Sequence, residues 1–375
     1  IEDSAEYCIL SSDTTAYEGT SGEPISKHSD SPPEPLAMEP DHVPPPPPVI
    51  GDEAFLRLDL LEMTNIPRYW TSVLSLGKGA FGEIHLVQSD QLDATGENII
   101  HNEFVLKIVK FPSSELDKVV REVEMHRRCR NHQNVLFAGV SYCQQYGDGY
   151  RVQMCLEYAA LSDMGLFSMK EKEERHIAFV CKEVINALQH IHTLRVVHGD
   201  LSIRNVLATH RGVVKISDFG MADTLENTTR RGQVTYGGTP GFIAPEVISM
   251  TGYDTRADMW SLGILALFLS TGKNPFQQGI LFDFQTYRRL IAEEFYPDLN
   301  QLNLSDDFYS FITDLNHYDP AERCDAWEIS TDNFIKTSCT QQEFLDHYKQ
   351  VRARYGMDLP IPDDSQAFSV PTVRE

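Results

Sequence analysis

The sequence predicts an α+β fold with two lobes, a small antiparallel sheet with one helix followed by a larger, mainly helical lobe. Two observations lead to this prediction. Between about residues 69 and 159, apolar residues form the short blocks and alternations that are typical of strands, interrupted by one amphipathic helix. Beyond residue 160, apolar residues recur at helical spacing instead. No internal repeat is apparent, so the two lobes are expected to follow one another along the chain.

The elements of the smaller lobe follow from local patterns. Four stretches are expected to be strands: Val73–Leu76, Ile84–Val87, Glu103–Val109 and Tyr150–Tyr158. The stretch Asp90–Asn102 reads as a long hairpin loop between the second strand and the third. Leu116–Arg130 is charged and amphipathic, which predicts the one helix of this lobe.

The larger lobe is expected to be built from helices. Arg175–His192 carries apolar residues at helical spacing, and Asp258–Ser270 is apolar on nearly all sides, which predicts a buried helix. Phe308–Leu315 and Gln342–Tyr355 read as further helices.

Residues 1–50 differ in composition from the rest of the chain. They hold ten acidic residues, one Lys and ten of the 20 prolines, so they cannot bury enough apolar surface to offset their ordering entropy and are expected to be disordered. Pro44–Pro48 reads as a stiff linker or as a docking site for polyproline-binding domains. The expected domain limits are a linker over 51–68, lobes over 69–159 and 160–338, and a C-terminal helix and tail over 339–375.

Charge and cysteine usage exclude several classes of protein. The net charge of −23 argues against nucleic acid as a partner. The seven dispersed cysteines fit reduced thiols in the cytoplasm better than a disulfide framework or a zinc site. The longest apolar run, Leu262–Leu269, is far shorter than the roughly 20 residues that cross a bilayer, so no membrane span is expected. The chain starts without Met, so it is also compatible with the intracellular part of a membrane receptor.

Three glycines lie between the first two expected strands. Gly77, Gly79 and Gly82 form a Gly-x-Gly-x-x-Gly motif, and glycine lets a backbone approach phosphate oxygens closely. In a dinucleotide-binding fold the third glycine would begin a helix. Here Glu83–Val87 continues as a strand, which favours a flap over a nucleotide.

Lys107 lies between apolar residues on the strand that follows this motif. By itself it would be a solvent-facing lysine. However, it precedes a helix that bears Glu122, and a lysine that contacts the inner phosphates of a nucleotide needs a carboxylate to hold it in place. Glu124 is the alternative partner, and the spacing of ten residues between Glu122 and His132 favours Glu122.

The remaining charged motifs lie in the larger lobe. Asp200 and Asn205 belong to the run His198-Gly199-Asp200-Leu201-Ser202-Ile203-Arg204-Asn205, and Asp218-Phe219-Gly220 follows. Acids that only cap turns are the alternative interpretation. In this order, together with the glycine loop and Lys107, these residues are the parts needed to move a phosphoryl group from a nucleotide to a protein hydroxyl.

Jointly these motifs resemble the eukaryotic protein kinase family, over roughly residues 69–336. The resemblance implies ATP as the phosphoryl donor, Mg²⁺ as the metal and proteins as substrates in signalling. Asp200 would orient the acceptor hydroxyl, and Asn205 and Asp218 would hold the metal. Leu156 would be the gatekeeper, and Glu157, Tyr158 and Ala159 would grip adenine. Two scaffold contacts are also implied, between Glu246 and Arg323 and between Asp258 and the amides of the catalytic loop.

The acceptor hydroxyl is contested within the sequence. The catalytic loop is similar to that of receptor tyrosine kinases because Arg204 is the fourth residue after Asp200. The segment Gly238–Glu246 resembles the serine/threonine form, with Phe242 where tyrosine kinases usually carry Trp. Because Arg204 is expected nearest the transferred phosphate, tyrosine is favoured. A serine/threonine or dual-specificity kinase is the alternative, and a pseudokinase scaffold is a further one, against which the intact charged motifs argue.

One residue departs from the family's usual pattern. Gly199 stands where the family usually has an arginine that binds the phosphorylated activation segment, here the stretch from Asp218 to Glu246. Glycine offers no charge for that contact. Activity is therefore expected to depend only weakly on phosphorylation of this segment. Tyr236 is the candidate for autophosphorylation, and a loop tyrosine packed on the larger lobe is the equal alternative.

Overall fold

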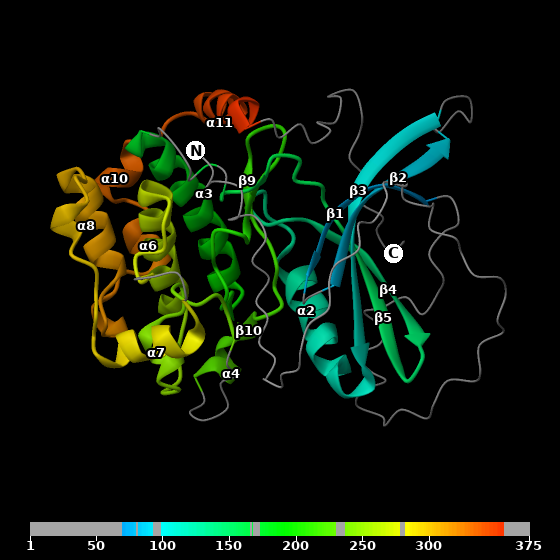
Figure 1. Ribbon diagram of the computed structural model, residues 1–375, viewed down its shortest axis with the longest axis horizontal. Helices are drawn as coiled ribbons and strands as arrows, with labels where there is room; N and C mark the ends of the chain where they lie inside the picture. The colour runs from blue at the N-terminus through cyan, green and yellow to red at the C-terminus, as the bar shows by residue number, and fades with distance from the viewer. Residues whose placement is uncertain are drawn as a thin grey trace, which may run out of the picture.

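The computed structural model describes residues 70–79, 82–92, 99–165, 167, 173–229, 237–277 and 282–355. The expected disorder of residues 1–50, the linker over 51–68, the Pro44–Pro48 hypothesis and Tyr236 lie outside these residues. The described chain forms an α+β fold of two lobes, with the sheet of the N-lobe on one side and the helices of the C-lobe on the other (Figure 1).

The N-lobe is an antiparallel sheet in the strand order β1-β2-β3-β5-β4. Its strands are β1 (Trp70–Gly79), β2 (Gly82–Leu92), β3 (Ile99–Pro112), β4 (Ala138–Tyr146) and β5 (Gly149–Leu156). The long hairpin loop expected over Asp90–Asn102 is wrong at both ends, because β2 and β3 stay paired from Glu83↔Ile108 out to Leu92↔Ile99. Strand β4 was not predicted.

One helix packs on this sheet. The turn η3 (Ser113–Glu115) leads into α2 (Leu116–Cys129), which lies between the sheet and the C-lobe (Figure 1). Val119, Val120 and Val123 are buried on one face of α2 among apolar residues of β3, β4 and β5. On another side of α2, Arg121 contacts the C-lobe directly, with its Nη1 2.8 Å from Asp223 Oδ2 on β10 (Asp223–Thr224).

The C-lobe is organised around two long helices. The central helix α3 (Glu174–Thr193) packs against α6 (Arg256–Thr271), which is buried on nearly all sides, as expected. The other helices of the described residues are α4 (Leu225–Thr228), α5 (Pro245–Ile248), α7 (Phe284–Ala292), η5 (Leu299–Gln301), α8 (Asp306–Leu315), η6 (Pro320–Glu322), α9 (Ala326–Ile329), α10 (Asn333–Lys336) and α11 (Gln341–Tyr355).

Short strands of the C-lobe flank the loops that carry the charged motifs. They are β6 (Ser162–Asp163), β7 (Val196–Val197), β8 (Val206–Ala208), β9 (Val214–Ile216) and β10 (Asp223–Thr224). β8 pairs with both β6 and β9, and β7 pairs with β10. These pairs fix the loops that carry the charged motifs, because Asp200 and Asn205 lie between β7 and β8 and Asp218 follows β9.

No helix in the described part of the chain is both long enough and apolar enough to cross a membrane.

Candidate active site

Lys107 joins three elements that are far apart in the sequence. Its Nζ lies 2.7 Å from Glu122 Oε1 on α2 and 3.1 Å from Asp218 Oδ1 after β9. Lys107 is held on the central strand of the sheet, where it pairs with Ile84 of β2 and Met154 of β5. The lysine contacts Glu122 and not the alternative Glu124, so the N-lobe, α2 and the C-lobe meet at one ammonium group.

The ammonium group of Lys107 attracts both carboxylates, but burial and the neighbouring Asp218 still raise the pKa of Glu122. Burial alone would lower the pKa of Lys107, but the carboxylates of Glu122 and Asp218 raise it, so the lysine is charged. Burial alone would raise the pKa of Asp218, but Lys107 and the N–H of Gly220 lower it, so this carboxylate is ionised. Asp218 has a φ of +63°, a left-handed conformation that costs a non-glycine residue of order 1–3 kcal/mol. Such strain persists where surrounding contacts impose it, as Lys107 does here.

A column of rings holds α2 against the C-lobe. Phe219, next to Asp218, is buried and stacks on His126 of α2 with ring centroids 4.8 Å apart. On its other side Phe219 lies 5.0 Å from the ring of His198 in the catalytic loop. Burial lowers the pKa of His126 to about 4, so this ring is neutral, and its Nε2 lies 2.7 Å from the carbonyl oxygen of Leu136. The column orients Glu122 toward Lys107, because Glu122 and His126 are one helical turn apart on α2.

Asp200 lies at the start of the loop between β7 and β8. Its Oδ1 accepts hydrogen bonds from the Thr239 N–H (2.7 Å) and the Thr239 hydroxyl (2.8 Å). Its Oδ2 accepts from Asn205 Nδ2 at 3.0 Å. Burial raises the pKa of Asp200, while the hydrogen bonds from Thr239 oppose this shift. The carboxylate is therefore both desolvated and held in one orientation, which suits a positioned base.

Asp258 of α6, which is buried, binds the start of the catalytic loop, the run from His198 to Asn205. Its carboxylate accepts the N–H groups of His198 (2.9 Å) and Gly199 (3.0 Å), as the resemblance implied, and also His192 Nε2 at 2.9 Å. Burial alone would raise the pKa of Asp258, but the bond with His192 lowers it. The second implied scaffold contact is present too, with Arg323 Nη1 2.8 Å from Glu246 Oε1 and both side chains buried.

The oxygen atoms of Asn205 and Asp218 fit a hard divalent cation. The amide nitrogen of Asn205 donates to the main-chain and side-chain oxygens of Asp200, which leaves Oδ1 as its ligand atom. Asp218 uses Oδ1 for Lys107 and Gly220, so Oδ2 is its remaining oxygen. No group of three or more His, Cys, Asp or Glu suited to a metal occurs in the described residues. Mg²⁺ prefers oxygen ligands and is usually bound by one or two protein groups together with substrate phosphates and water, so the oxygen atoms of Asn205 and Asp218 suit it.

The glycine loop closes the hairpin of β1 and β2. Gly79 pairs with Gly82 at the end of this hairpin, and Gly77 is exposed. Gly82 has a φ of +117°, and a Cβ there would lie 2.0 Å from the carbonyl oxygen of Ile108. Any larger residue at 82 would push the hairpin away from β3. The third glycine is therefore required by the sheet itself.

The expected adenine site lies where β5 leaves the sheet. Leu156, the last residue of β5, is 9% exposed, and Glu157, Tyr158 and Ala159 follow without regular structure. The side chain of Glu157 binds both lobes, because its Oε2 lies 3.1 Å from Lys215 Nζ on β9 and accepts the N–H of Phe137, which precedes β4. This ion pair was not predicted from the sequence, although Lys215 lies only three residues before Asp218.

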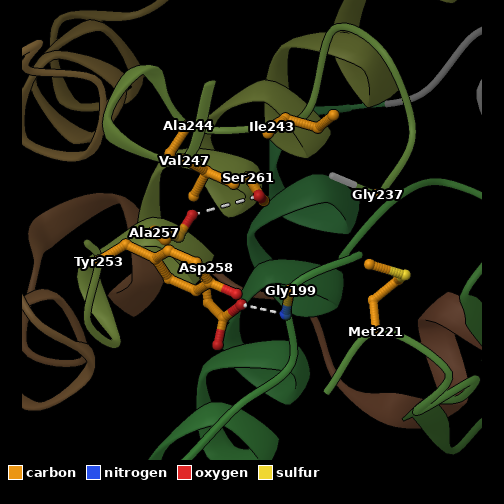
Figure 2. Close-up of a pocket in the computed structure, with 10 residues that line it drawn as sticks. All are labelled: Gly199, Met221, Gly237, Ile243, Ala244, Val247, Tyr253, Ala257, Asp258 and Ser261. Atoms are coloured by element: carbon orange, nitrogen blue, oxygen red, sulfur yellow. Dashed lines mark hydrogen bonds between the residues drawn. The ribbon is translucent and has the colours of Figure 1, made fainter. Parts of the chain in front are cut away.

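Two predicted features lie apart from this network. Arg204 is exposed, and none of the hydrogen bonds described for the chain joins it to Asp200. Gly199 lines a cavity of roughly 10 Å³, space for about one water molecule, beside Met221 and Gly237 (Figure 2). Gly199 has a φ of +74°, and a Cβ there would lie 2.8 Å from the Met221 carbonyl oxygen. The main chain here is therefore shaped for glycine.

Sequence reasoning missed Thr239 as a partner of Asp200. No local pattern reveals that its hydroxyl meets a carboxylate 39 residues earlier in the chain.

Comparison with known proteins agrees with this geometry. The protein kinase domain family matches residues 70–335. The Caenorhabditis elegans protein named "Putative tyrosine-protein kinase C03B1.5" is 52% identical over 316 residues, which are 84% of this chain and 96% of that protein.

Serine/threonine kinases are similar at lower identity. The "Serine/threonine-protein kinase cst-1" of C. elegans is 29% identical over 269 residues, 70% of this chain and 50% of that protein. The "Serine/threonine-protein kinase dst1" of Dictyostelium discoideum is 32% identical over 271 residues, 70% of this chain and 34% of that protein. The chain thus spans half the length or less of these two relatives.

Proposed function

The chain belongs to the protein kinase family, and from that premise we propose that it transfers the γ-phosphoryl group of Mg·ATP to tyrosine hydroxyls of proteins in signalling. The observation that carries the phosphoryl-transfer part is the junction of Lys107, Glu122 and Asp218 next to the pair of Asp200 and Asn205. Phosphoryl transfer needs positioned charges of both signs more than covalent chemistry from the protein.

Each side chain takes one task in this proposal. Lys107 would bind the inner phosphates, with Glu122 holding its ammonium group in place. Asn205 Oδ1 and Asp218 Oδ2 would hold Mg²⁺, which when bound offsets the negative charge of the phosphates. Gly77, Gly79 and Gly82 would cover the phosphates with main chain. The main chain of Glu157 and Ala159, behind the gatekeeper Leu156, would contact adenine.

Asp200 would hold the acceptor hydroxyl and take its proton. Its carboxylate is oriented by Thr239 and Asn205 and desolvated by burial. Positioned bases of this kind contribute typically 10²–10⁴-fold to a rate. Because the pKa of Asp200 is raised, it is a better proton acceptor than an exposed aspartate.

Tyrosine is proposed as the acceptor for two reasons. Arg204 follows Asp200 by four residues, and its exposed guanidinium can bind the transferred phosphate or the substrate. The relative at 52% identity carries a tyrosine-kinase name, and this chain matches 96% of the length of that relative.

A specific contact favours serine or threonine as the second candidate. Thr239 donates two hydrogen bonds to Asp200, so the segment before Phe242 lies directly against the expected base. A substrate main chain bound along this segment would lie close to Asp200, and a short serine or threonine side chain fits such a distance better than a tyrosine ring. The relatives at 29% and 32% identity are named serine/threonine kinases.

The experiment that separates these functions is phosphoamino-acid analysis after incubation with Mg·ATP and a mixed protein substrate. Phosphotyrosine alone supports the proposal. Phosphoserine or phosphothreonine alone replaces it with the second candidate, and all three together mean dual specificity. Equal turnover by the wild type and Asp200→Asn would instead favour a pseudokinase scaffold.

The partners and the location of the protein are also part of this proposal. Six cysteines of the described residues are free, which supports a reducing, cytoplasmic environment for this domain, whether alone or as the intracellular part of a receptor. Pro44–Pro48 is proposed as a docking site for polyproline-binding domains, and deletion of these five prolines tests it by loss of binding to such domains.

A further inference from the structure

Helix α11 lies along the top of the C-lobe above α3 (Figure 1), beyond the last residue of the matched kinase domain. Phe344 anchors its first half, with a ring centroid 4.9 Å from that of Phe179 on α3 and 5.5 Å from that of Phe167. Arg175, also on α3, forms an ion pair with Glu343 at 3.0 Å. These contacts attach the helix to the body of the C-lobe.

The second half of α11 reaches the segment that connects the lobes. The Tyr348 hydroxyl lies 3.0 Å from the carbonyl oxygen of Leu161 and 2.7 Å from that of Asp163, so its one proton is shared between them. Arg352 Nη1 donates to the carbonyl oxygen of Ala160 at 2.6 Å. Tyr348 and Arg352 are one turn apart on one face of α11, and they are 0% and 5% exposed.

The opposite edge of this segment is bound to the catalytic loop's strand. The N–H groups of Leu161 and Met164 donate to the carbonyl oxygens of Ala208 and Val206 on β8. Residues 160–164 therefore lie between β8, which follows Asn205, and α11. N–H groups of this segment donate to carbonyl oxygens of β8, and its carbonyl oxygens accept hydrogen bonds from side chains of α11.

Arg352 is connected to the expected adenine site through its bond with Ala160, which follows Ala159. Burial and the carboxylate of Glu103 raise the pKa of Tyr158, and the charge of Arg352 opposes this shift. Tyr158 lies between Glu157 and Ala159, and Ala160 is the next residue in the chain. The end of α11 thus contacts the main chain one residue beyond the groups proposed to hold adenine.

We propose that Tyr348 and Arg352 are positioning residues for the nucleotide, which act by holding residues 160–163 and through them the adenine-binding main chain. This inference rests on the proposed kinase function. If the carbonyls of this segment lose their donors, the segment shifts and adenine binds less well. The contacts that orient Lys107 and Asp200 come from Glu122, Asp218, Thr239 and Asn205 and do not include residues 160–163, so kcat is expected to change little.

The test compares Tyr348→Phe with a matched control in the full chain. Tyr318→Phe also removes one hydroxyl that donates to a carbonyl, that of Phe295 at 2.7 Å, but on a part of the C-lobe away from this segment. Both variants are expected to lose similar stability in thermal melting. Tyr348→Phe is expected to raise the Kd for Mg·ADP, by calorimetry, and the KM for ATP by about fivefold, which corresponds to ~1 kcal/mol, with kcat within about twofold. Tyr318→Phe is expected to leave the Kd and KM unchanged.

Arg352 provides a second, independent measurement. Arg352→Ala is expected to raise the Kd for Mg·ADP at least as much as Tyr348→Phe, and Arg352→Lys to recover part of the loss because it restores a donor. Equal Kd values for the wild type, Tyr348→Phe and Arg352→Ala would overturn the inference alone. Failure of the wild type to bind Mg·ADP would overturn the kinase proposal and this inference with it. A fall of kcat in Tyr348→Phe and Arg352→Ala with an unchanged KM for ATP would also overturn the inference.

Discussion

The two sides of the cleft between the lobes are held in different ways. On the side assigned to the nucleotide, buried charges from β3, α2 and the loop after β9 meet at Lys107. On the side assigned to the acceptor, neutral donors of Thr239 and Asn205 hold Asp200, and the nearby Arg204 is exposed. Burying a charge is costly unless an opposite charge pairs with it. A change to one residue of the Lys107 network would therefore be costly, which limits the functions that this side of the cleft can serve.

The acceptor side is less specified because its contacts are neutral and its features point in two directions. Arg204 favours tyrosine, whereas the contact of Thr239 with Asp200 favours serine or threonine. Under the proposed function, ion pairs between distant elements set the reaction class, whereas the two loops that carry Arg204 and Thr239 set the acceptor type. If this is correct, changes on the two sides should separate into different kinetic parameters.

The largest effect is expected at the point where the two sides meet. Asp200→Asn keeps the shape of the side chain but removes the proton acceptor, so kcat should fall roughly 10²–10⁴-fold. The Kd for Mg·ADP should change little, since Asp200 is assigned to the acceptor. Steady-state kinetics and calorimetry on the same samples measure both quantities. A variant that lost nucleotide binding to the same extent would show that the two sides are not separable.

A smaller effect is expected from breaking the buried network on the nucleotide side. Glu122→Gln removes one partner of Lys107, and loss of one member of a buried pair typically costs ~3 kcal/mol of unfolding free energy. Chemical denaturation measures this loss. Glu124→Gln is the control, because Glu124 is two residues away on the same helix and does not hold Lys107. Equal stability of the two variants would contradict the assignment of Glu122.

The two sides of the cleft also differ in how many of their contacts the sequence alone predicts. The pairing of Lys107 with Glu122 and the place of Asp218 follow from motif order, because each residue type has one task in phosphoryl transfer. The contacts of Thr239, Lys215 and Tyr348 do not, since each joins segments that come together only when the chain folds. Tyr348 meets the carbonyl oxygen of Leu161 across 187 residues.

Strand limits show the same division between local and long-range information. The helices α3 and α6 end within two residues of the expected limits because apolar spacing along one segment determines them. The hairpin of β2 and β3 extends further than expected because pairing between strands, not the composition of residues 90–102, decides where a ladder stops. The argument for a serine or threonine acceptor rests on a contact of this second kind, that of Thr239 with Asp200.

A moderate effect on pH dependence is expected from the acceptor side. Thr239 lowers the pKa of Asp200 against the rise caused by burial, so Thr239→Val should raise this pKa further. A base must be ionised to accept a proton, so the acidic limb of kcat/KM should move to higher pH in the variant. Thr229→Val is a control in the same segment, since its hydroxyl donates to the carbonyl oxygen of Leu225 instead. An unchanged acidic limb would mean that Asp200 does not control it.

The smallest effect is expected from removal of phosphate from the activation segment. Gly199 offers no charge to a phosphate, and its backbone, with φ at +74° and the Met221 carbonyl close by, is shaped for glycine. Thr239 holds Asp200 through hydrogen bonds that need no phosphate. Phosphatase treatment should therefore change kcat/KM by less than about twofold, whereas a phosphate-dependent segment would lose far more. Abolished activity after treatment would show that the acceptor side is ordered by phosphate through a contact other than residue 199.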